Sequence, residues 1–206
     1  MWYGQKETDK YIAEYFPEGY MGNCVEVGVA DGKKGSNTLH FEELGWDVLC
    51  IDPIPFHVEA AKKIRKNVVE YACSQPCLTG TREFYVFDIG ENNILSSLSG
   101  LEPDPKLLVS HGHLINKCST IKVEARTLDW ILTNNKWPSE IDFISIDTEG
   151  TELNVLKGII FAMTDIKLLV VENNHNDTEI EEYLKWQGWR KDQRYFVNDF
   201  YVRNNI

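Results

Sequence analysis

The chain has 206 residues, of which 43% are hydrophobic and 26% charged, proportions typical of a globular domain with a single buried core. Its formal net charge is -11 and its pI is about 4.9. Such an acidic protein repels phosphate backbones and anionic lipid, so we expect neither nucleic acid nor a membrane as a partner.

The N-terminal sequence MWYGQKETDK lacks the apolar core of a signal peptide, and no stretch approaches the length of a membrane span. We therefore expect a cytoplasmic location; the oligomeric state that we expect is a monomer or a homodimer. The cysteines are odd in number, and Cys24 and Cys50 have apolar neighbours, which predicts buried free thiols rather than disulfides. Cys73 and Cys77 are spaced like zinc ligands, but no second Cys/His pair follows at a suitable distance.

Short apolar runs alternate with helical patterns in the first part of the chain. In chain order they predict a helix over Glu7–Phe16, a strand over Asn23–Val29, a helix over Ser36–Leu44, a strand over Asp47–Asp52, a helix over Phe56–Lys66 and a strand over Asn67–Cys73. We expect residues 1–20 to form an N-terminal helical cap on a single domain that spans residues 1–206.

The middle of the chain, residues 80–120, departs from this alternation. Arg82–Asp88 has the period of a half-exposed strand, and Ile94–Pro105 is rich in Ser, Gly and Pro, which predicts a loop or lid. The stretches KLLVSHGHLI and STIKVEA are expected to pair as further strands. We interpret the whole segment as a variable insertion on the substrate side of the domain.

The last third of the chain is regular again. It predicts a helix capped by Thr127 that runs through Thr133, a strand over Ile141–Asp147, a helix over Thr151–Phe161, a strand over Lys167–Asn173, a helix over Thr178–Gln187 and two closing strands within Gly188–Asn204. Strands that alternate with helices indicate an α/β fold with a mostly parallel sheet and helices on both faces. The final pair of strands predicts an antiparallel hairpin at the sheet edge.

The turn GVADG, which follows the first strand, is the first candidate for ligand binding. Ligands of such sheets bind at the carboxyl ends of the strands, where the strand order reverses. Gly28 and Gly32 carry no side chain and allow a close backbone approach. Asp52 ends the next strand, where an acid meets the ribose hydroxyls of a nucleotide.

Two acids beside this turn narrow the choice of ligand. The glycines are not spaced as G-x-G-x-x-G, and the carboxylates of Glu26 and Asp31 would repel a pyrophosphate, which argues against a nicotinamide-dependent oxidoreductase. A ligand with a positive end, such as the amino group and sulfonium of S-adenosylmethionine, suits these carboxylates. We expect Asp52 to bind the ribose, and Glu26 and Asp31 to shape the methionine end electrostatically.

Four stretches resemble, in order, the signatures of FkbM-type S-adenosylmethionine-dependent methyltransferases: VEVGVADGKKGSNTLHFEELGWDVLCIDPIP, VEARTLDWI, IDFISIDTEGTELNVLKGI and LLVVENN. The resemblance runs from Cys24 to Asn173, and VNDFYVR near the end also fits. It implies a Rossmann-like class I methyltransferase fold with a seven-stranded sheet whose last strand is antiparallel. The family usually has Glu at the end of the second strand, where this chain has the shorter Asp52.

The resemblance implies an O-methyltransferase that uses S-adenosylmethionine and releases S-adenosylhomocysteine. The expected acceptor is a hydroxyl group of a sugar or glycan, with a deoxysugar such as rhamnose or fucose favoured; a polyketide, a lipid or another small molecule is the alternative. A binding module that has lost catalysis is a further alternative. The residues expected to contact the cofactor are Glu26, Gly28, Asp31, Gly32, Ser36, Asn37, Asp52, Pro53, Cys73 and Asp147.

Methyl transfer to a hydroxyl group needs a positioned acceptor and a route for its proton. Asp147 and Glu149 follow one core strand, and Glu172, Asn173 and His175 follow the next. One possible route is a Mg²⁺ or Mn²⁺ ion, bound by Asp147, Glu172 and Asn173, that lowers the pKa of the hydroxyl. The other route is metal-free, with Asp147, Glu149 or His175 as general base.

Overall fold

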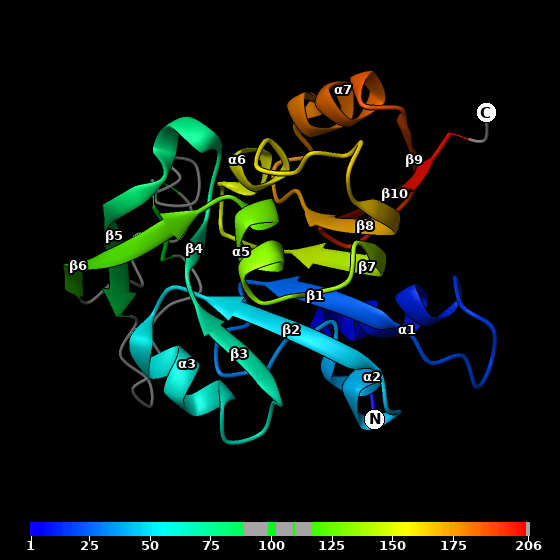
Figure 1. Cartoon of the computed structure of the whole chain (residues 1–206), viewed down its shortest axis with the longest axis horizontal. Helices are drawn as coiled ribbons and strands as arrows, with labels where there is room; N and C mark the ends of the chain where they lie inside the picture. The colour runs from blue at the N-terminus through cyan, green and yellow to red at the C-terminus, as the bar shows by residue number, and fades with distance from the viewer. Residues whose placement is uncertain (89–98, 102–108, 110–116, 205–206) are drawn as a thin grey trace.

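The structure is a computed structural model, which describes residues 1–88, 99–101, 109 and 117–204 (Figure 1). Most of the predicted lid Ile94–Pro105, and most of the stretch KLLVSHGHLI, lie outside the described residues. None of the helices in the described residues is long and apolar enough to cross a membrane.

In the described part of the chain, seven strands form the main sheet, in the order β3-β2-β1-β7-β8-β10-β9 (Figure 1). The strands are β1 (Asn23–Val27), β2 (Asp47–Asp52), β3 (Asn67–Glu70), β7 (Glu140–Ile146), β8 (Asp165–Glu172), β9 (Trp189–Tyr195) and β10 (Asn198–Arg203). Neighbouring strands from β3 to β8 are parallel, and β10 is antiparallel to both β8 and β9. The predicted α/β class with a mostly parallel sheet is confirmed.

The predicted antiparallel hairpin lies at the edge of the main sheet, and β9 is the outer of its two strands. The C-terminal strand β10 is antiparallel, as expected, and it lies between β8 and β9. The reason is visible in the two sequences: Phe200 and Tyr201 of β10 are fully buried, whereas β9 reads WRKDQRY. Charged side chains protect an exposed strand edge from pairing with another chain, so the polar strand occupies the edge.

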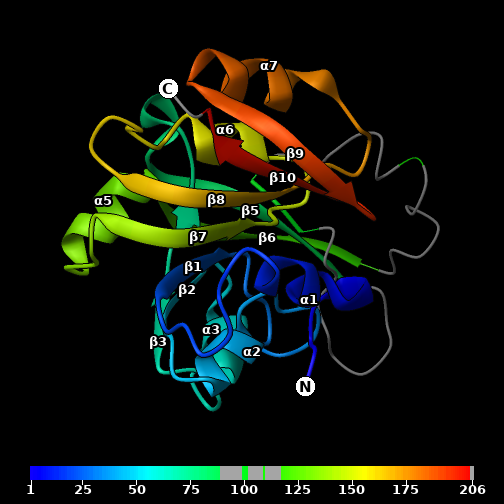
Figure 2. The same ribbon diagram turned by 90° about the vertical axis from the view of Figure 1, so that its right-hand side faces the viewer.

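Helices cover both faces of the main sheet. They are α1 (Thr8–Ala13), α2 (Leu39–Glu43), α3 (Pro55–Ala61), α5 (Leu128–Asn134), α6 (Glu152–Leu156) and α7 (Thr178–Trp186), with short 3₁₀ turns η1 (Gln5–Glu7) and η2 (Pro76–Leu78). Alternation along β1 divides the core: Cys24 packs with α1, α2 and α3, whereas Val25 packs with α5, α6 and α7. Figure 2 shows α5 and α1 on opposite sides of the strands.

The helix predicted over Ser36–Leu44 begins later than expected, and its local hydrogen bonds explain why. The hydroxyl of Ser36 accepts from the backbone N–H of Leu39 at 3.0 Å, so it does act at the start of α2. The same hydroxyl donates to Glu26, which holds residues 36–38 in a turn instead of a helix. The predicted cap at Thr127 is confirmed, because its side chain accepts from the N–H of Trp130.

A second sheet of three strands accompanies the main one within the described residues, in the order β4-β6-β5. Its strands are β4 (Ala72–Cys73), β5 (Gly80–Asp88) and β6 (Lys117–Arg126). The strand predicted over Asn67–Cys73 is therefore split: β3 pairs with β2 in the main sheet, and β4 pairs with β6 in the second. The predicted strands REFYVFD and STIKVEA are confirmed, and they pair with each other.

Candidate active site at the carboxyl edge of the sheet

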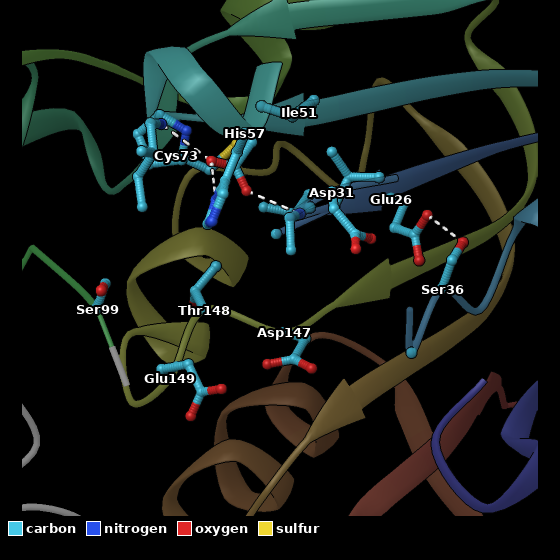
Figure 3. Close-up of a pocket in the computed structure, with 18 of the residues that line it drawn as sticks. Glu26, Asp31, Ser36, Ile51, His57, Cys73, Ser99, Asp147, Thr148 and Glu149 are labelled. Carbon is cyan, nitrogen blue, oxygen red and sulfur yellow. Dashed lines mark hydrogen bonds and ion pairs between the residues drawn. The ribbon is translucent and has the colours of Figure 1, made fainter. Parts of the chain in front are cut away.

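A cavity of about 590 Å³ opens where β1, β2, β7 and β8 end (Figure 3). Its volume lies in the range of small-molecule and cofactor sites. The strand ends form its floor, residues Tyr3 and Gln5 of the N-terminal segment form part of one wall, and Phe84 of the second sheet forms part of another. The predicted position of the ligand site, at the carboxyl edge of a parallel sheet, is therefore the position of a real cavity.

Gly28 allows the ends of β1 and β7 to meet beneath this cavity. Its φ is 89°, and a Cβ at this position would lie 1.8 Å from the carbonyl oxygen of Asp147. Two residues later, Ala30 has a φ of 49° and donates its N–H to the Oδ2 atom of Asp52 at 2.9 Å. The turn is thus hydrogen-bonded to the end of β2 and packed against the end of β7, which fixes the shape of the cavity floor.

Asp52 is 4% exposed and already has three partners. Its Oδ2 accepts from Ala30, and its Oδ1 accepts from the N–H of Ile54 at 2.9 Å. The Nδ1 atom of His57 lies 3.1 Å from Oδ1, and Figure 3 shows the imidazole ring pointing into the cavity. Because a carboxylate oxygen can accept two hydrogen bonds, Oδ2 still has room for one more donor, such as a ribose hydroxyl.

Glu26 stabilises the second turn of the site. Its carboxylate accepts from the N–H of Asn37 at 2.7 Å, from the hydroxyl of Ser36 at 2.8 Å and from the hydroxyl of Thr38 at 2.6 Å. The guanidinium of Arg65 lies 3.2 Å from the same carboxylate. Glu26 lines the cavity, as expected, but Arg65 balances its charge and the neighbouring turn uses most of its acceptor capacity.

Gly32 and Asp31 differ in their placement. Gly32 is not among the described residues that line the cavity; a Cβ there would lie 3.0 Å from Ala61 and from Arg65, so this glycine serves the packing of α3. Asp31 does line the cavity, and its Oδ1 accepts from the N–H groups of Lys33 and Lys34. The acid therefore also caps the turn that follows it.

The opposite side of the cavity is mainly apolar and lies between the two sheets. Its described lining includes Ile51, Pro53, Ile54, Ala72, Cys73, Phe84 and Leu101. Cys73 is buried and burial raises its thiol pKa, whereas Cys77 is exposed. Among the described residues this pair does not belong to a group that could hold a metal ion. Cys73 therefore lines the wall of the cavity.

Three carboxylates converge at the ends of β7 and β8. Asp147, Glu152 and Glu172 each offer an oxygen, and these oxygens lie within 4.8 Å of one another. Burial, with smaller contributions from the nearby carboxylates of Glu152 and Glu26, raises the pKa of Asp147 to about 7. Burial also raises the pKa of Glu172 well above its usual value, and the charge of Asp147 adds to this effect.

This carboxylate cluster fits a divalent cation. The Oδ1 atom of Asp147 is buried and has no hydrogen-bond partner among the described residues. Glu152 is held in place because its Oε1 accepts from the N–H of Thr148 at 2.8 Å and of Gly150 at 3.0 Å. Carboxylate oxygens are the ligands that Mg²⁺ and Mn²⁺ prefer, and a cation would remove the repulsion between the three acids.

Asn173 follows Glu172 directly in the sequence, but its side chain forms hydrogen bonds with other residues than the three clustered acids. Its Nδ2 donates to the carbonyl of Asp177 and to Asp199, both at 2.9 Å, and its Oδ1 accepts from the N–H of Asp177 at 2.8 Å. The amide thus fastens the loop after β8, and the acid that lies with Asp147 and Glu172 is Glu152.

The two other candidate bases are placed differently from each other. Glu149 lines the cavity from the turn after β7, where its φ is 57°. His175 is not among the described residues that line the cavity, because the chain turns away from it at Asn173. Asp147 and Glu149 therefore share the cavity, and His175 does not line it.

Sequence reasoning missed His57, which lines the cavity, and Glu152, which belongs to the carboxylate cluster. His57 looks like one more residue of an amphipathic helix, although its position five residues after Asp52 places it on the first turn of α3. Glu152 looks like an ordinary acid at a helix start, where the helix dipole favours it. A usable signal for Glu152 was its spacing, because it follows Asp147 by five residues around the Thr148–Thr151 turn.

Solved structures give a distant likeness. Two crystal structures of the N-terminal domain of human METTL16, one of them in complex with SAH, match with TM-scores of 0.45 and 0.44 at 11% identity. Each match covers 94% of this chain, which spans 65% of the length of the matched chains. No curated protein gives a significant match.

The sequence itself gives a much closer match. Residues 26–197 match the model of the methyltransferase FkbM domain, a span that includes the glycine turn, Asp52 and the whole carboxylate cluster. This match covers well over half of the chain, and the predicted family resemblance is confirmed. The chain belongs to the methyltransferase FkbM family.

Proposed function

We propose that the protein is an S-adenosylmethionine-dependent O-methyltransferase that acts on a hydroxyl group of a sugar or glycan. The observation that carries this proposal is the cavity itself: Asp52, Asp147 and Glu172, from the ends of three strands, line one space together with an apolar wall. Membership of the FkbM family supports methyl transfer as the reaction. The family resemblance of the sequence motifs favours a hydroxyl acceptor.

The described residues provide complementary surfaces for the parts of the cofactor. The remaining acceptor site on Asp52 Oδ2 suits a ribose hydroxyl, with His57 orienting the carboxylate from its other side. The apolar wall between the sheets, which includes Cys73 and Phe84, suits the adenine ring. The acids at the end of β7 lie where they attract the positively charged methionine end.

The transfer is an in-line displacement. The acceptor oxygen attacks the methyl carbon, a C–O bond forms while the S–CH₃ bond breaks, and the sulfonium becomes the neutral thioether of S-adenosylhomocysteine. The acceptor hydroxyl loses its proton in this step. The carboxylates of Asp147 and Glu149, which line the same cavity, can accept that proton. The protein therefore contributes chiefly position and a route for the proton.

We further propose that Asp147, Glu152 and Glu172 bind Mg²⁺ or Mn²⁺. Such an ion would lower the pKa of the acceptor hydroxyl when bound. We expect chelation to abolish transfer of labelled methyl groups to a panel of methyl glycosides, and Mn²⁺ to restore it. At 100 times its Kd, Mn²⁺ should also raise the melting temperature by about 5–10 °C, and it should not do so for Glu172→Gln.

The same assay separates the alternatives. Transfer that survives exhaustive chelation, with no gain from Mn²⁺, would remove the cation and leave Asp147 or Glu149 as the base. Transfer to lipid or polyketide alcohols, with none to glycosides, would keep the methyltransferase and replace its acceptor. A protein that binds S-adenosylhomocysteine and transfers no methyl group to any of these acceptors would point to a binding module.

A further inference from the structure

Backbone strain is concentrated at the cavity edge of this molecule. Among the described residues, those with positive φ that are not glycine are Lys6, Glu7, Ala30, Lys136, Glu149, Asn176 and Phe196. All of these except Lys136 lie in segments at the carboxyl edge of the main sheet, whereas Lys136 precedes the amino end of β7. Such strained conformations persist only where the surrounding structure enforces them, and they cluster at functional sites.

Phe196 is the bulkiest of these residues and the least expected. It is the first residue of the two-residue loop that joins β9 to β10, and its φ is 53°. A two-residue hairpin loop with positive φ at its first position normally has glycine or asparagine there. A bulky side chain in this conformation is a true outlier, and the phenyl ring is 49% exposed, so core packing does not explain it.

The hairpin tip is hydrogen-bonded to two residues whose sequence neighbours line the cavity. On one side, the hydroxyl of Tyr195 donates to the carbonyl of Lys6 at 2.8 Å, and the residue before Lys6 lines the cavity. On the other side, the N–H of Asn173 donates to the carbonyl of Val197 at 2.8 Å, and the residue before Asn173 belongs to the carboxylate cluster. Figure 2 shows the tip of the β9–β10 hairpin on the side where α1 lies.

We propose that Phe196 is an acceptor-binding residue, whose ring stacks on the apolar face of the sugar that is methylated. Phe196 is not among the described residues that line the cavity, so the sugar that it contacts extends beyond this lining. A pyranose presents C–H groups on its faces and hydroxyls around its rim, so it can place a face on the phenyl ring while a hydroxyl points into the cavity. The phenyl ring offers a large apolar surface with few rotamers to immobilise. The inference rests on the proposed function and adds to it the residue that selects for a ring-shaped acceptor.

The backbone conformation of Phe196 lowers the stability of the protein, whereas its ring is needed for acceptor binding. Phe196→Gly removes both the ring and the backbone strain. We expect its KM for a glycoside acceptor, such as methyl α-L-rhamnopyranoside or methyl α-L-fucopyranoside, to rise about five- to tenfold. Its melting temperature should not fall below that of the wild type, and its Kd for S-adenosylhomocysteine should stay within about twofold.

Two variants serve as controls. Phe196→Tyr retains an aromatic face and should keep the KM within about twofold of the wild-type value. Lys136→Gly relieves the same kind of strain at the opposite edge of the sheet, so it should leave both the KM and the cofactor Kd unchanged. A KM effect that is confined to the loss of the ring would support the stacking role.

The outcomes distinguish this inference from the function on which it rests. Methyl transfer to a glycoside with an unchanged KM in Phe196→Gly would overturn the inference and leave the proposed function intact. A lower melting temperature together with weaker S-adenosylhomocysteine binding in that variant would give Phe196 a structural role and overturn it as well. Failure of the wild-type protein to methylate any glycoside would overturn both.

Discussion

Gly28 shows how a single residue sets the geometry of the cavity. We expect Gly28→Ala to destabilise the protein by more than about 4 kcal/mol, because the new Cβ would overlap the carbonyl of Asp147 at 1.8 Å. Gly188→Ala is the matched control: its φ of 85° is also positive, but nothing lies within 4 Å of its Cβ position. It should cost only about 1 kcal/mol, the strain of the backbone alone.

Urea unfolding of both variants measures this difference. The two substitutions share the backbone penalty, so the excess for Gly28→Ala reports the close approach of β1 and β7. Equal losses of unfolding free energy in the two variants would show that the strand ends can separate without cost. The cavity floor would then be less rigid than the contact between Gly28 and Asp147 requires.

At the scale of elements, Arg65 joins the pieces that surround the cofactor turn. The side chain is fully buried and donates to Glu42 of α2, to Glu26 of β1 and to the carbonyl of Gly32. We expect Arg65→Lys to destabilise the protein by about 2–3 kcal/mol, because a single ammonium cannot replace a guanidinium fork with several partners. Its affinity for S-adenosylhomocysteine should fall with it, since the turn at residues 36–38 loses support.

Lys62 of the same segment provides the comparison. It pairs with Glu59 at 3.4 Å, but both side chains are largely exposed. Lys62→Ala should change the unfolding free energy by less than about 0.5 kcal/mol, since exposed ion pairs contribute little. If Arg65→Lys were equally harmless in chemical denaturation, the buried network would not be what holds the turn.

Local sequence patterns predicted most of the elements, and the failures have tertiary causes. The strand Asp47–Asp52 is found with its predicted bounds. An apolar run that begins after a turn and ends at an acid marks both ends of a buried strand. The strand predicted through Cys73 is broken after Glu70, since β4 pairs with Ala125 and Arg126, which lie far along the chain. Pairing between distant segments of this kind has no local signature.

The site was predictable where it depends on strand ends and not where it depends on loops. The carboxyl edge of a parallel sheet brings Asp52, Asp147 and Glu172 to one cavity, independently of the conformation of the loops. The amide of Asn173 is instead satisfied by a later loop and by Asp199 of β10, and only the folded chain shows these partners.

At the scale of the whole molecule, the cavity is enclosed by three parts of the chain that are distant in sequence. The N-terminal segment contributes Tyr3, the second sheet contributes Phe84, and the main sheet contributes the acids. The proposed function requires S-adenosylmethionine to bind in this cavity with its ribose against Asp52. Calorimetric titration with S-adenosylhomocysteine tests this requirement with the intact protein.

Three variants sharpen the titration. Asp52→Ala removes the acid that is expected to bind the ribose, and Asp52→Glu supplies the longer acid that is usual in the family. Asp47→Ala removes an exposed acid at the opposite end of the same strand, far from the cavity. A lost hydrogen bond to a charged group is worth about 1.5–3 kcal/mol, so Asp52→Ala should weaken binding about ten- to hundredfold.

The predicted result is one binding site per chain in the wild-type protein, an affinity kept in Asp52→Glu and Asp47→Ala, and the large loss in Asp52→Ala. No heat of binding in the wild-type protein, or an Asp52→Ala variant that binds as tightly as Asp47→Ala, would contradict the account.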